Sequence, residues 1–250
     1  MASVACGIDI GGSGVKAALV DLRTGKFIGD RIRIETPKPA TPDAVAEVCR
    51  ELLDRLEVGK DIPVGIAFPA PIVHGVVEFM ANLDPSWTGT DVKKLMKKHL
   101  GRKVSALNDA DAAGLAEVAY GAAKGVTGEV IVTTQGTGIG SAIIVDGTLV
   151  PNTELGHLEI DGHDAEKQAS SGQKTLQDLT WEQWAERLQR YYSHVEMLFS
   201  PDLFVVGGGV SQNHEKFMPL LKLKTPMVPA QLFNTAGIVG AAYEAARRAK

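Results

Sequence analysis

One structural unit occurs twice along this chain, and that duplication restricts the possible folds more than any other feature of the sequence. The first copy has the pattern of three strands, a helix and a further strand, over residues 4–10, 15–21, 27–34, 42–57 and 64–68. The second copy has the same order, over residues 129–134, 138–145, 148–150, 181–199 and 203–206. In each copy a glycine-rich turn joins the first two strands. The repetition predicts two α/β units of similar architecture.

The segments outside the two copies suggest where the chain divides into domains. A strand is expected at 104–107, and an alanine-rich helix follows it up to Ala123. Residues 234–249 have the pattern of a closing helix. Two domains are therefore expected, an N-terminal one over 1–107 completed by the C-terminal helix 235–250, and a C-terminal one over 108–234. If the two units face each other, both glycine-rich turns lie at the mouth of one cleft, which is a layout for binding phosphate.

Composition excludes several classes of protein. The chain has 250 residues, 44% of them hydrophobic, so it can bury a substantial core. The net charge is −4 and the basic residues are scattered, which argues against a nucleic-acid partner. The lysines at 93–98 are better explained as a solvated helix face than as a track for a polyanion. No apolar run is long enough to cross a membrane, and no signal sequence is expected.

Cysteine usage points to a reducing compartment. Only Cys6 and Cys49 occur, which supports neither a disulfide framework nor a thiolate metal site. We therefore expect a soluble, cytoplasmic protein.

The first glycine-rich turn has the composition of a phosphate cradle. Asp9 ends the first strand, Gly11, Gly12, Ser13 and Gly14 form the turn, and Lys16 follows. Backbone N–H groups can approach an anion closely where side chains are absent. A carboxylate beside such a cradle is best explained by a cation between them, so Asp9 is a candidate to hold Mg²⁺, directly or through water. The alternative is a glycine hairpin without a ligand.

Two further glycine-rich segments are candidates for binding the phosphoryl donor. The second turn contains the residues Thr134, Gly136, Thr137 and Gly138. The third candidate follows a strand and consists of Gly208 and Gly209, which as a plain strand-to-helix turn would have no ligand. Neither a Walker P-loop nor a dinucleotide fingerprint is present, which disfavours P-loop NTPases and Rossmann dehydrogenases.

Polar side chains at two places suggest chemistry on a hydroxyl group. Asn108 and Asp109 stand where a strand gives way to a helix, so Asp109 is a candidate general base. A helix N-cap is the alternative for this pair. Glu154 and His157 combine an acceptor with a donor, which suits recognition of a polyol better than a zinc site. Asn82, near Trp87, is a weaker candidate for sugar contact.

These motifs, in this order, resemble the ROK family of sugar kinases over nearly the whole chain, and within it most closely the polyphosphate glucokinases. The resemblance rests on segments 9–16, 108–110, 136–140, 151–159 and 234–242. It implies an actin-like, ribonuclease H-like fold with two α/β domains around a cleft. It also implies a homodimer, dependence on Mg²⁺, and phosphorylation of glucose at its 6-hydroxyl from polyphosphate, ATP or both.

The resemblance also implies roles for individual residues. Asp109 would be the general base. The glucose ligands would be Asn82, Asn108, Asp109, Glu154, His157 and Glu166. Glu166 stands as counterpart to a glutamate that follows a zinc loop in relatives, with Glu159 as its competitor. Because the cysteines of that loop are missing here, no structural zinc is expected.

Other functions remain open on the sequence. One is an ATP-only hexose kinase acting on mannose or an amino sugar. Another is a non-catalytic, sugar-sensing ROK protein, although no helix-turn-helix precedes the first strand. The last is a phosphohydrolase that cleaves polyphosphate without a sugar acceptor.

Overall fold

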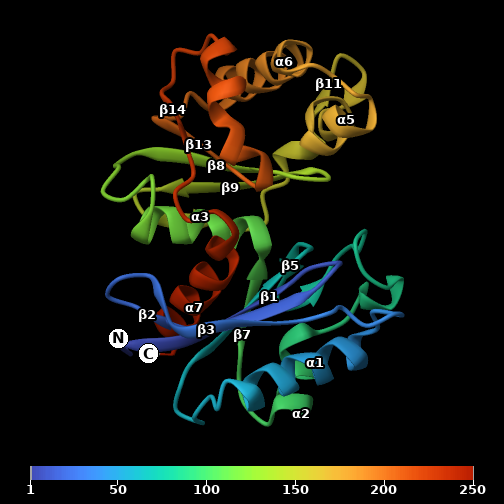
Figure 1. The fold of residues 1–250 in the computed structure, drawn as a ribbon, viewed down its shortest axis with the longest axis vertical. Coiled ribbons are helices and arrows are strands. Elements are labelled where there is room, and N and C mark those ends of the chain that lie inside the picture. Colours follow the sequence, from blue (N-terminus) through green and yellow to red (C-terminus); the bar gives the residue numbers. More distant parts are fainter. Residues whose placement is uncertain (1, 250) are drawn as a thin grey trace. The chain divides into compact units, whose positions relative to one another are not determined.

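The structure of the protein is a computed structural model that describes residues 2–249, and it divides into two compact units (Figure 1). Unit 1 comprises the chain up to Ala116 together with the C-terminal segment from Thr235, and unit 2 is Glu117–Asn234. The first division lies within a helix that begins at Asp109, whereas the sequence prediction divided the chain ahead of this helix.

The two sheets confirm the internal duplication. The five-stranded sheet of unit 1 has the order β3-β2-β1-β4-β7, and that of unit 2 has the order β10-β9-β8-β13-β14. In each sheet the first three strands form an antiparallel meander, and the remaining two run parallel to the first strand of the unit. The same strand order in both sheets is the three-dimensional form of the repeated sequence pattern.

Unit 1 has helices on both faces of its sheet. Its strands are β1 Val4–Ile10, β2 Val15–Asp21, β3 Lys26–Ile34, β4 Val64–Phe68 and β7 Ser105–Asn108. Its helices are α1 Pro42–Arg55, α2 Val92–Leu100, α3 Asp109–Tyr120, which continues past the division, and α7 Ala236–Arg248. The connection from β4 to α2 contains a short hairpin, β5 Ile72–Val73 with β6 Val76–Val77, and the 3₁₀ turn Pro85–Trp87.

The alternation of side chains along β1 explains this layering. Cys6, Ile8 and Ile10 point to the core shared with α1, because successive strand residues face opposite sides. Gly7 faces α7, and a methyl carbon placed on it would lie 1.9 Å from the carbonyl oxygen of Ile238. Glycine at this position therefore lets α7 lie directly on the sheet.

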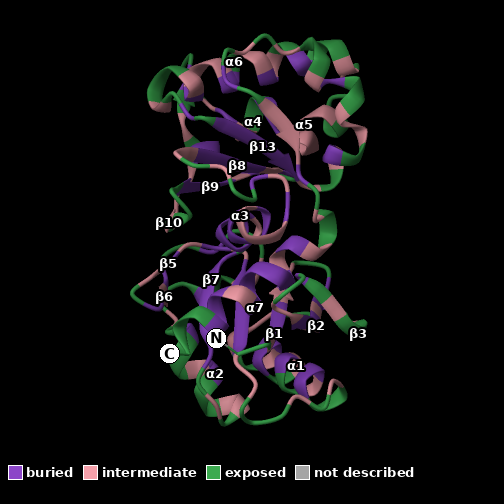
Figure 2. Cartoon of the chain, turned by 90° about the vertical axis from the view of Figure 1, so that its left-hand side faces the viewer, coloured by how far each residue is buried: buried purple, intermediate pink, exposed green. Residues whose placement is uncertain are grey.

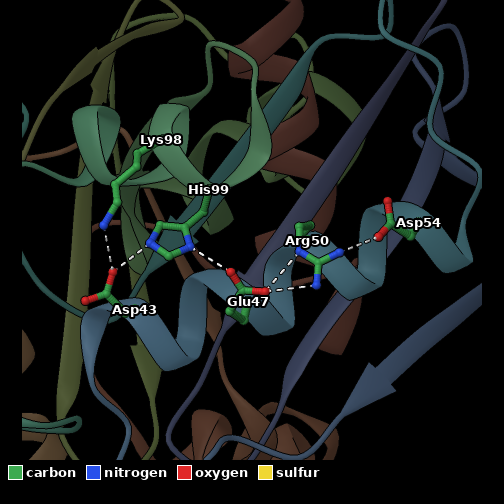
Figure 3. A network of polar contacts seen from close by, with 6 residues as sticks. All are labelled: Asp43, Glu47, Arg50, Asp54, Lys98 and His99. Atoms are coloured by element: carbon green, nitrogen blue, oxygen red, sulfur yellow. Dashed lines mark hydrogen bonds and ion pairs between the residues drawn. The ribbon is translucent and has the colours of Figure 1, made fainter.

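A polar network joins α1 to α2 on the outside of unit 1 (Figure 3). Nε2 of His99 lies 2.6 Å from Oδ1 of Asp43, and Nδ1 lies 2.8 Å from Oε1 of Glu47. Hydrogen bonding with His99 lowers the pKa of both carboxyls. The histidine therefore fastens the two helices to each other through both ring nitrogens.

Unit 2 packs a long helix against its sheet. Its strands are β8 Glu129–Gln135, β9 Ile139–Val145, β10 Thr148–Val150, β13 Leu203–Gly207 and β14 Met227–Pro229. The helix α6, Trp181–Phe199, begins with a capping box in which Thr180 and Gln183 satisfy each other's backbone N–H groups. Its side chains Trp184, Leu188 and Tyr192 are buried in the core of this unit. Figure 2 shows β8 and β13 buried, in contrast to the largely exposed edge strand β3 of unit 1.

Two segments of unit 2 differ from the sequence prediction. The residues from Glu154 to Glu159 alternate in a way that is compatible with a strand, but they contain the 3₁₀ turn Leu155–His157 and only then the short strand β11 Glu159–Ile160, which pairs with β12 His163–Asp164. The small, polar residues of the segment 165–177 favour a mobile loop, but the segment forms the short helices α4 Glu166–Ala169 and α5 Ser171–Leu176. Ser170 caps α5 by accepting the N–H of Gln173. In a segment of small polar residues, this capping serine could not be told apart from a loop residue.

The remaining turns are short. The strand β13 leads into the 3₁₀ segments Gly209–Lys216 and Met218–Leu220, and another such turn, Phe233–Thr235, precedes α7. No helix within residues 2–249 combines the length and the apolar composition that a membrane crossing requires.

Candidate active site

The first glycine turn, residues 11–14, leaves its backbone accessible. The N–H of Gly11 donates to the carbonyl of Gly14 at 3.1 Å, which closes the hairpin between β1 and β2. Gly12 and Ser13 at its tip are exposed. The hydroxyl of Thr36 donates to the carbonyl of Gly11 at 2.5 Å and fixes the orientation of the turn. An exposed, braced turn of this kind suits an anion, as the sequence suggested.

Arg33 lies beside this turn, and the sequence analysis missed it. Its Nη2 donates to the carbonyl of Ser13 at 2.6 Å. A methyl carbon on Gly14 would lie 2.5 Å from Nε of Arg33, so glycine at 14 makes room for the guanidinium rather than for a ligand. The register of β2 with β3, in which Lys16 is opposite Arg33, brings the arginine here. The position of Arg33 could have been predicted only from the correct register of β2 with β3.

Asp9 and Lys16 are neighbours across the β1–β2 pair. Nζ of Lys16 lies 3.4 Å from Oδ2 of Asp9, and both side chains are partly exposed. Asp9 also lies next to the first turn of α7, since a methyl carbon on Gly237 would be 3.3 Å from its Cγ. The positive charge of Lys16 is therefore shared with Asp9 and not devoted to an anion alone.

The geometry of Asp9 fits the expected Mg²⁺. This ion is typically held by one or two carboxylates together with water and substrate phosphates. Asp9 is a partly exposed carboxylate at the end of the strand that leads into the glycine turn, so one coordinating oxygen beside a phosphate site is available. The residues present are compatible with the metal.

Asn108 and Asp109 both contact the start of α3 but differ in exposure. Oδ1 of Asn108 accepts the N–H groups of Ala110 at 2.8 Å and Asp111 at 3.2 Å, so the amide caps α3. Asn108 and Ala110 are buried, whereas Asp109 between them is exposed. Oδ1 of Asp109 accepts the N–H of Ala110 as well, at 2.8 Å, so both side chains cap α3, and Asp109 is the exposed residue of the pair.

Asn82 lies near the first glycine turn. Its backbone carbonyl oxygen would be 3.2 Å from a methyl carbon placed on Gly12, and the residue is exposed. Unit 1 thus brings Asn82 close to the glycine turn at 11–14.

The second glycine turn, residues 136–138, is braced by α5. The N–H of Gly136 donates to the carbonyl of Gly138 at 3.0 Å. The carbonyl of Gly136 accepts the N–H of Gly172 at 2.8 Å and the hydroxyl of Ser171 at 3.0 Å. Gly136 and Thr137 are exposed, and no atom lies within 4 Å of a methyl carbon placed on Gly136. The outer side of this turn is open to an anion, while Thr134 at the end of β8 is half-buried.

Glu166 is bound to the inner side of the second turn. Its Oε2 accepts the N–H of Ile139 at 3.1 Å. A methyl carbon on Gly138 would lie 2.2 Å from the same oxygen, so this glycine admits the carboxylate. A residue expected to bind sugar is thereby joined to a turn expected to bind the donor.

The 3₁₀ turn Leu155–His157 brings Glu154 and His157 close to each other. The N–H of His157 donates to the carbonyl of Glu154 at 3.0 Å. Ser141 on β9 fastens the turn, because its hydroxyl donates to the carbonyl of Thr153 and accepts the N–H of Leu155. Burial raises the pKa of Glu154, and the charge of Glu166 raises it further, while His157 lowers it. The three side chains therefore lie within electrostatic reach of one another.

His157 has a carboxylate partner that the sequence analysis did not name. Its Nδ1 lies 3.0 Å from Oδ2 of Asp164. Within residues 2–249, the ligand atoms of His157, Asp164 and Glu166 form the one group close enough to hold a metal ion. Glu159, the competitor of Glu166, is not in this group. Each of the three close residues already has a hydrogen-bond partner in the protein, so their closeness has an explanation without a metal.

The third glycine segment has one packed and one open position. Gly208 has φ +83°, and a methyl carbon on it would lie 2.1 Å from the carbonyl oxygen of Gln135. Gly209 is exposed and has no atom within 4 Å of such a carbon. Gly208 is therefore required by packing, and Gly209 alone offers close approach.

The two cysteines belong to the core of unit 1. Burial raises the pKa of the Cys6 and Cys49 thiols to about 12. They are hydrophobic packing residues and not thiolates.

Comparison with known proteins identifies the family. The ROK family pattern matches residues 5–175, which is more than half of the chain. The chain belongs to the ROK family. It is 52% identical to the polyphosphate glucokinase of Mycobacterium tuberculosis strain CDC 1551 / Oshkosh over 237 residues, 94% of this chain and 89% of that protein.

Solved structures of ROK proteins match almost the entire chain. The inorganic polyphosphate/ATP-glucomannokinase from Arthrobacter sp. strain KM has a TM-score of 0.92 and 54% identity, covering 99% of this chain and 100% of its own. A ROK family glucokinase from Streptomyces griseus, solved with glucose and AMPPNP, has a TM-score of 0.81 at 24% identity, covering 98% and 99%. These matches confirm the predicted actin-like α/β fold.

Proposed function

We propose that this ROK protein is a glucokinase that transfers a phosphoryl group from polyphosphate, ATP or both to the 6-hydroxyl of glucose. The observation that carries the proposal is the bond between Glu166 and Ile139, which joins a cluster suited to sugar hydroxyls to a turn suited to phosphate. The high identity to a polyphosphate glucokinase and to a polyphosphate/ATP-glucomannokinase supports the same reaction.

Sugar recognition is assigned mainly to unit 2. Glu154 and Glu166 offer carboxylate oxygens that accept hydrogen bonds from sugar hydroxyls, and His157 offers a ring N–H. Partial burial of Glu154 removes competing water and strengthens such bonds. Asn82 and Asn108 of unit 1 are proposed as further glucose contacts, with the oxygen of Asn108 already committed to capping α3.

Asp109 is proposed as the general base. In the reaction, the 6-hydroxyl gives its proton to the Asp109 carboxylate as its oxygen attacks the terminal phosphorus of the donor. The bond from that phosphorus to the leaving phosphate oxygen breaks, and the shortened polyphosphate or ADP departs. The exposed position of Asp109 at the start of α3 supports this role.

The donor is assigned to the glycine turns. Gly11, Gly12 and Ser13 in the first turn, Gly136 and Thr137 in the second, and Gly209 are the accessible positions. Asp9 would hold Mg²⁺, which would supply positive charge to neutralise the donor phosphates when bound. Lys16 adds positive charge to the same place.

We also propose that the protein is a cytoplasmic homodimer. The two buried, unpaired thiols support a reducing compartment. The dimer is inferred from the resemblance to ROK kinases.

Mannose is the second candidate acceptor. The glucomannokinase at 54% identity carries mannose in its name, which favours this sugar over amino sugars. The alternatives without sugar phosphorylation, a sensor or a polyphosphate hydrolase, predict no sugar phosphate under any condition.

A coupled assay tests the proposal. Purified protein is supplied with glucose, mannose or no sugar, each in combination with ATP or polyphosphate, and both sugar phosphate and free phosphate are measured. We expect glucose 6-phosphate with polyphosphate and little phosphate release without sugar. Product with ATP alone would refute the polyphosphate donor, and phosphate release that ignores sugar would refute the kinase.

A further inference from the structure

A hydrogen-bonded carboxylate lies behind the proposed sugar site. Asp164, at the end of β12, contacts His157 through one oxygen, with 3.0 Å between Oδ2 and Nδ1. Its other oxygen, Oδ1, accepts the backbone N–H of Glu166 at 3.2 Å. Asp164 therefore contacts two of the three unit 2 residues assigned to glucose.

The contact determines which ring nitrogen of His157 is available to a substrate. A carboxylate accepts hydrogen bonds, so Nδ1 carries a proton in the neutral ring as well as in the charged ring. Nε2 is left as the nitrogen that can face a sugar hydroxyl. Without Asp164 the neutral ring can place its proton on either nitrogen and can rotate.

The charges around the ring favour its protonated form. Hydrogen bonding to Asp164 is the main cause of a raised pKa for His157, and the charges of Glu166, Asp164 and Glu154 add to it against the effect of burial. A protonated ring donates Nε2–H to a hydroxyl, while Glu154 and Glu166 accept from other hydroxyls. A donor between two acceptors matches a polyol that both donates and accepts.

The second contact of Asp164 acts on Glu166. By accepting the N–H of Glu166, it fixes the first residue of α4, from which the Glu166 side chain extends to Ile139. Loss of Asp164 would loosen both the imidazole and the carboxylate. The two effects act on the sugar side and leave the open face of the donor turn at Gly136 unchanged.

We propose that Asp164 is a positioning residue for sugar binding, which fixes the tautomer and orientation of His157 and the start of the helix that carries Glu166. The inference rests on the proposed function in one respect, that His157 and Glu166 bind the sugar. It predicts that Asp164 controls the Michaelis constant for glucose and the pH range in which glucose binds.

The first experiment compares Asp164→Asn with wild type in steady-state kinetics. We expect the KM for glucose to rise about 10- to 100-fold, as for loss of a hydrogen bond to a charged group, with the KM for the donor unchanged and kcat reduced less. As pH rises, glucose affinity should also begin to fall at a lower pH in the variant than in wild type, because the imidazole of the variant loses its proton at a lower pH. Asp164→Glu should restore part of the affinity.

Asp161→Asn is the matched control. Asp161 lies in the turn between β11 and β12, is exposed, and pairs with Arg190 instead of His157. It should leave the KM for glucose near wild type. Equal effects of the two substitutions, or an unchanged KM and pH profile in Asp164→Asn, would overturn the proposal.

A titration that needs no activity provides the second test. The His157 ring is followed by NMR in the sugar-free protein, with its signal assigned by its loss in His157→Gln. We expect a lower pKa for His157 in Asp164→Asn than in wild type, and an unchanged value would overturn the control of the ring by Asp164. If wild type phosphorylates no sugar, the proposed function fails, and the titration still decides whether Asp164 governs the histidine.

Discussion

Replacing Gly138 with alanine is expected to weaken sugar binding while the protein stays folded. The added methyl carbon would lie 2.2 Å from Oε2 of Glu166, which is far inside van der Waals contact. The atom that must move is the end of a flexible side chain, so the backbone of the turn can stay in place. The cost therefore falls on the position of the Glu166 carboxylate and on its bond to Ile139.

The magnitude follows from that bond. A hydrogen bond to a charged group contributes about 1.5–3 kcal/mol, and its loss corresponds to an increase of about 10- to 100-fold in a dissociation constant. Part of this should be seen in glucose affinity, since a displaced Glu166 is a poorer sugar ligand. We expect the KM for glucose to rise by about tenfold or more, with a thermal unfolding midpoint close to wild type.

Gly136→Ala is the matched control for this experiment. It adds the same methyl group two residues earlier, where no atom lies within 4 Å, so the Glu166 carboxylate is undisturbed. Because Gly136 is itself a proposed donor contact, steady-state kinetics with varied glucose are measured at saturating donor, where they distinguish the two variants. Equal KM values for glucose in Gly138→Ala and Gly136→Ala would refute the reasoning.

Three further predictions follow from other contacts. Arg33→Gln should raise the KM for the donor about tenfold, because it removes a cation beside the first glycine turn. Arg31→Gln on the same strand should leave this KM unchanged. Equal donor KM values for the two variants would exclude Arg33 from donor binding. The two α1 carboxylates whose pKa His99 lowers stabilise the fold above about pH 4, and this contribution is lost as pH falls through their lowered values. The difference in melting temperature between wild type and His99→Gln should therefore shrink from about pH 6 to pH 3, and a constant difference would contradict the role given to these hydrogen bonds. Gly208→Ala should lower the free energy of unfolding, measured with denaturant, by about 1–3 kcal/mol or more, because Gly208 has a positive φ and packs against the β8 backbone. Gly209→Ala should leave the free energy of unfolding nearly unchanged. Similar losses in the two variants would contradict the packing argument.

The strands and long helices could be predicted because local pattern determines them. The alternation of Cys6, Ile8 and Ile10 marks a strand with one face in the core, and Gly11 to Gly14 can only be a turn. The apolar stripe of α6 and its Thr180 cap likewise predict a helix. Because the same order of elements occurs twice along the chain, it was enough to predict two similar sheets.

The details of the site depend on contacts between residues distant in the sequence. Arg33 lies over Gly14 because of strand register, which no local pattern specifies. Asp164 meets His157 through the β11–β12 hairpin, whose two short strands were not predicted from the sequence. The role of Gly138 depends on a carboxylate that arrives from α4.

The capping of α3 shows a limit of a different kind. Asn108 and Asp109 were treated as one polar pair with a choice between capping and catalysis. In the structure both side chains accept an N–H at the start of α3 and only Asp109 is exposed, so the capping interpretation is confirmed and catalysis by Asp109 stays a prediction. Sequence could not separate them, because the direction of each side chain depends on how β7 enters α3.

The most direct test of the account is the comparison of turnover with sugar binding in Asp109→Asn. The rate of glucose 6-phosphate formation and the dissociation constant of glucose are measured for this variant and for wild type under the same conditions. A general base contributes about 10²- to 10⁴-fold, so kcat should fall by that factor, while glucose binding should change by only a few-fold. Turnover near the wild-type rate would contradict the assignment of Asp109 as the base.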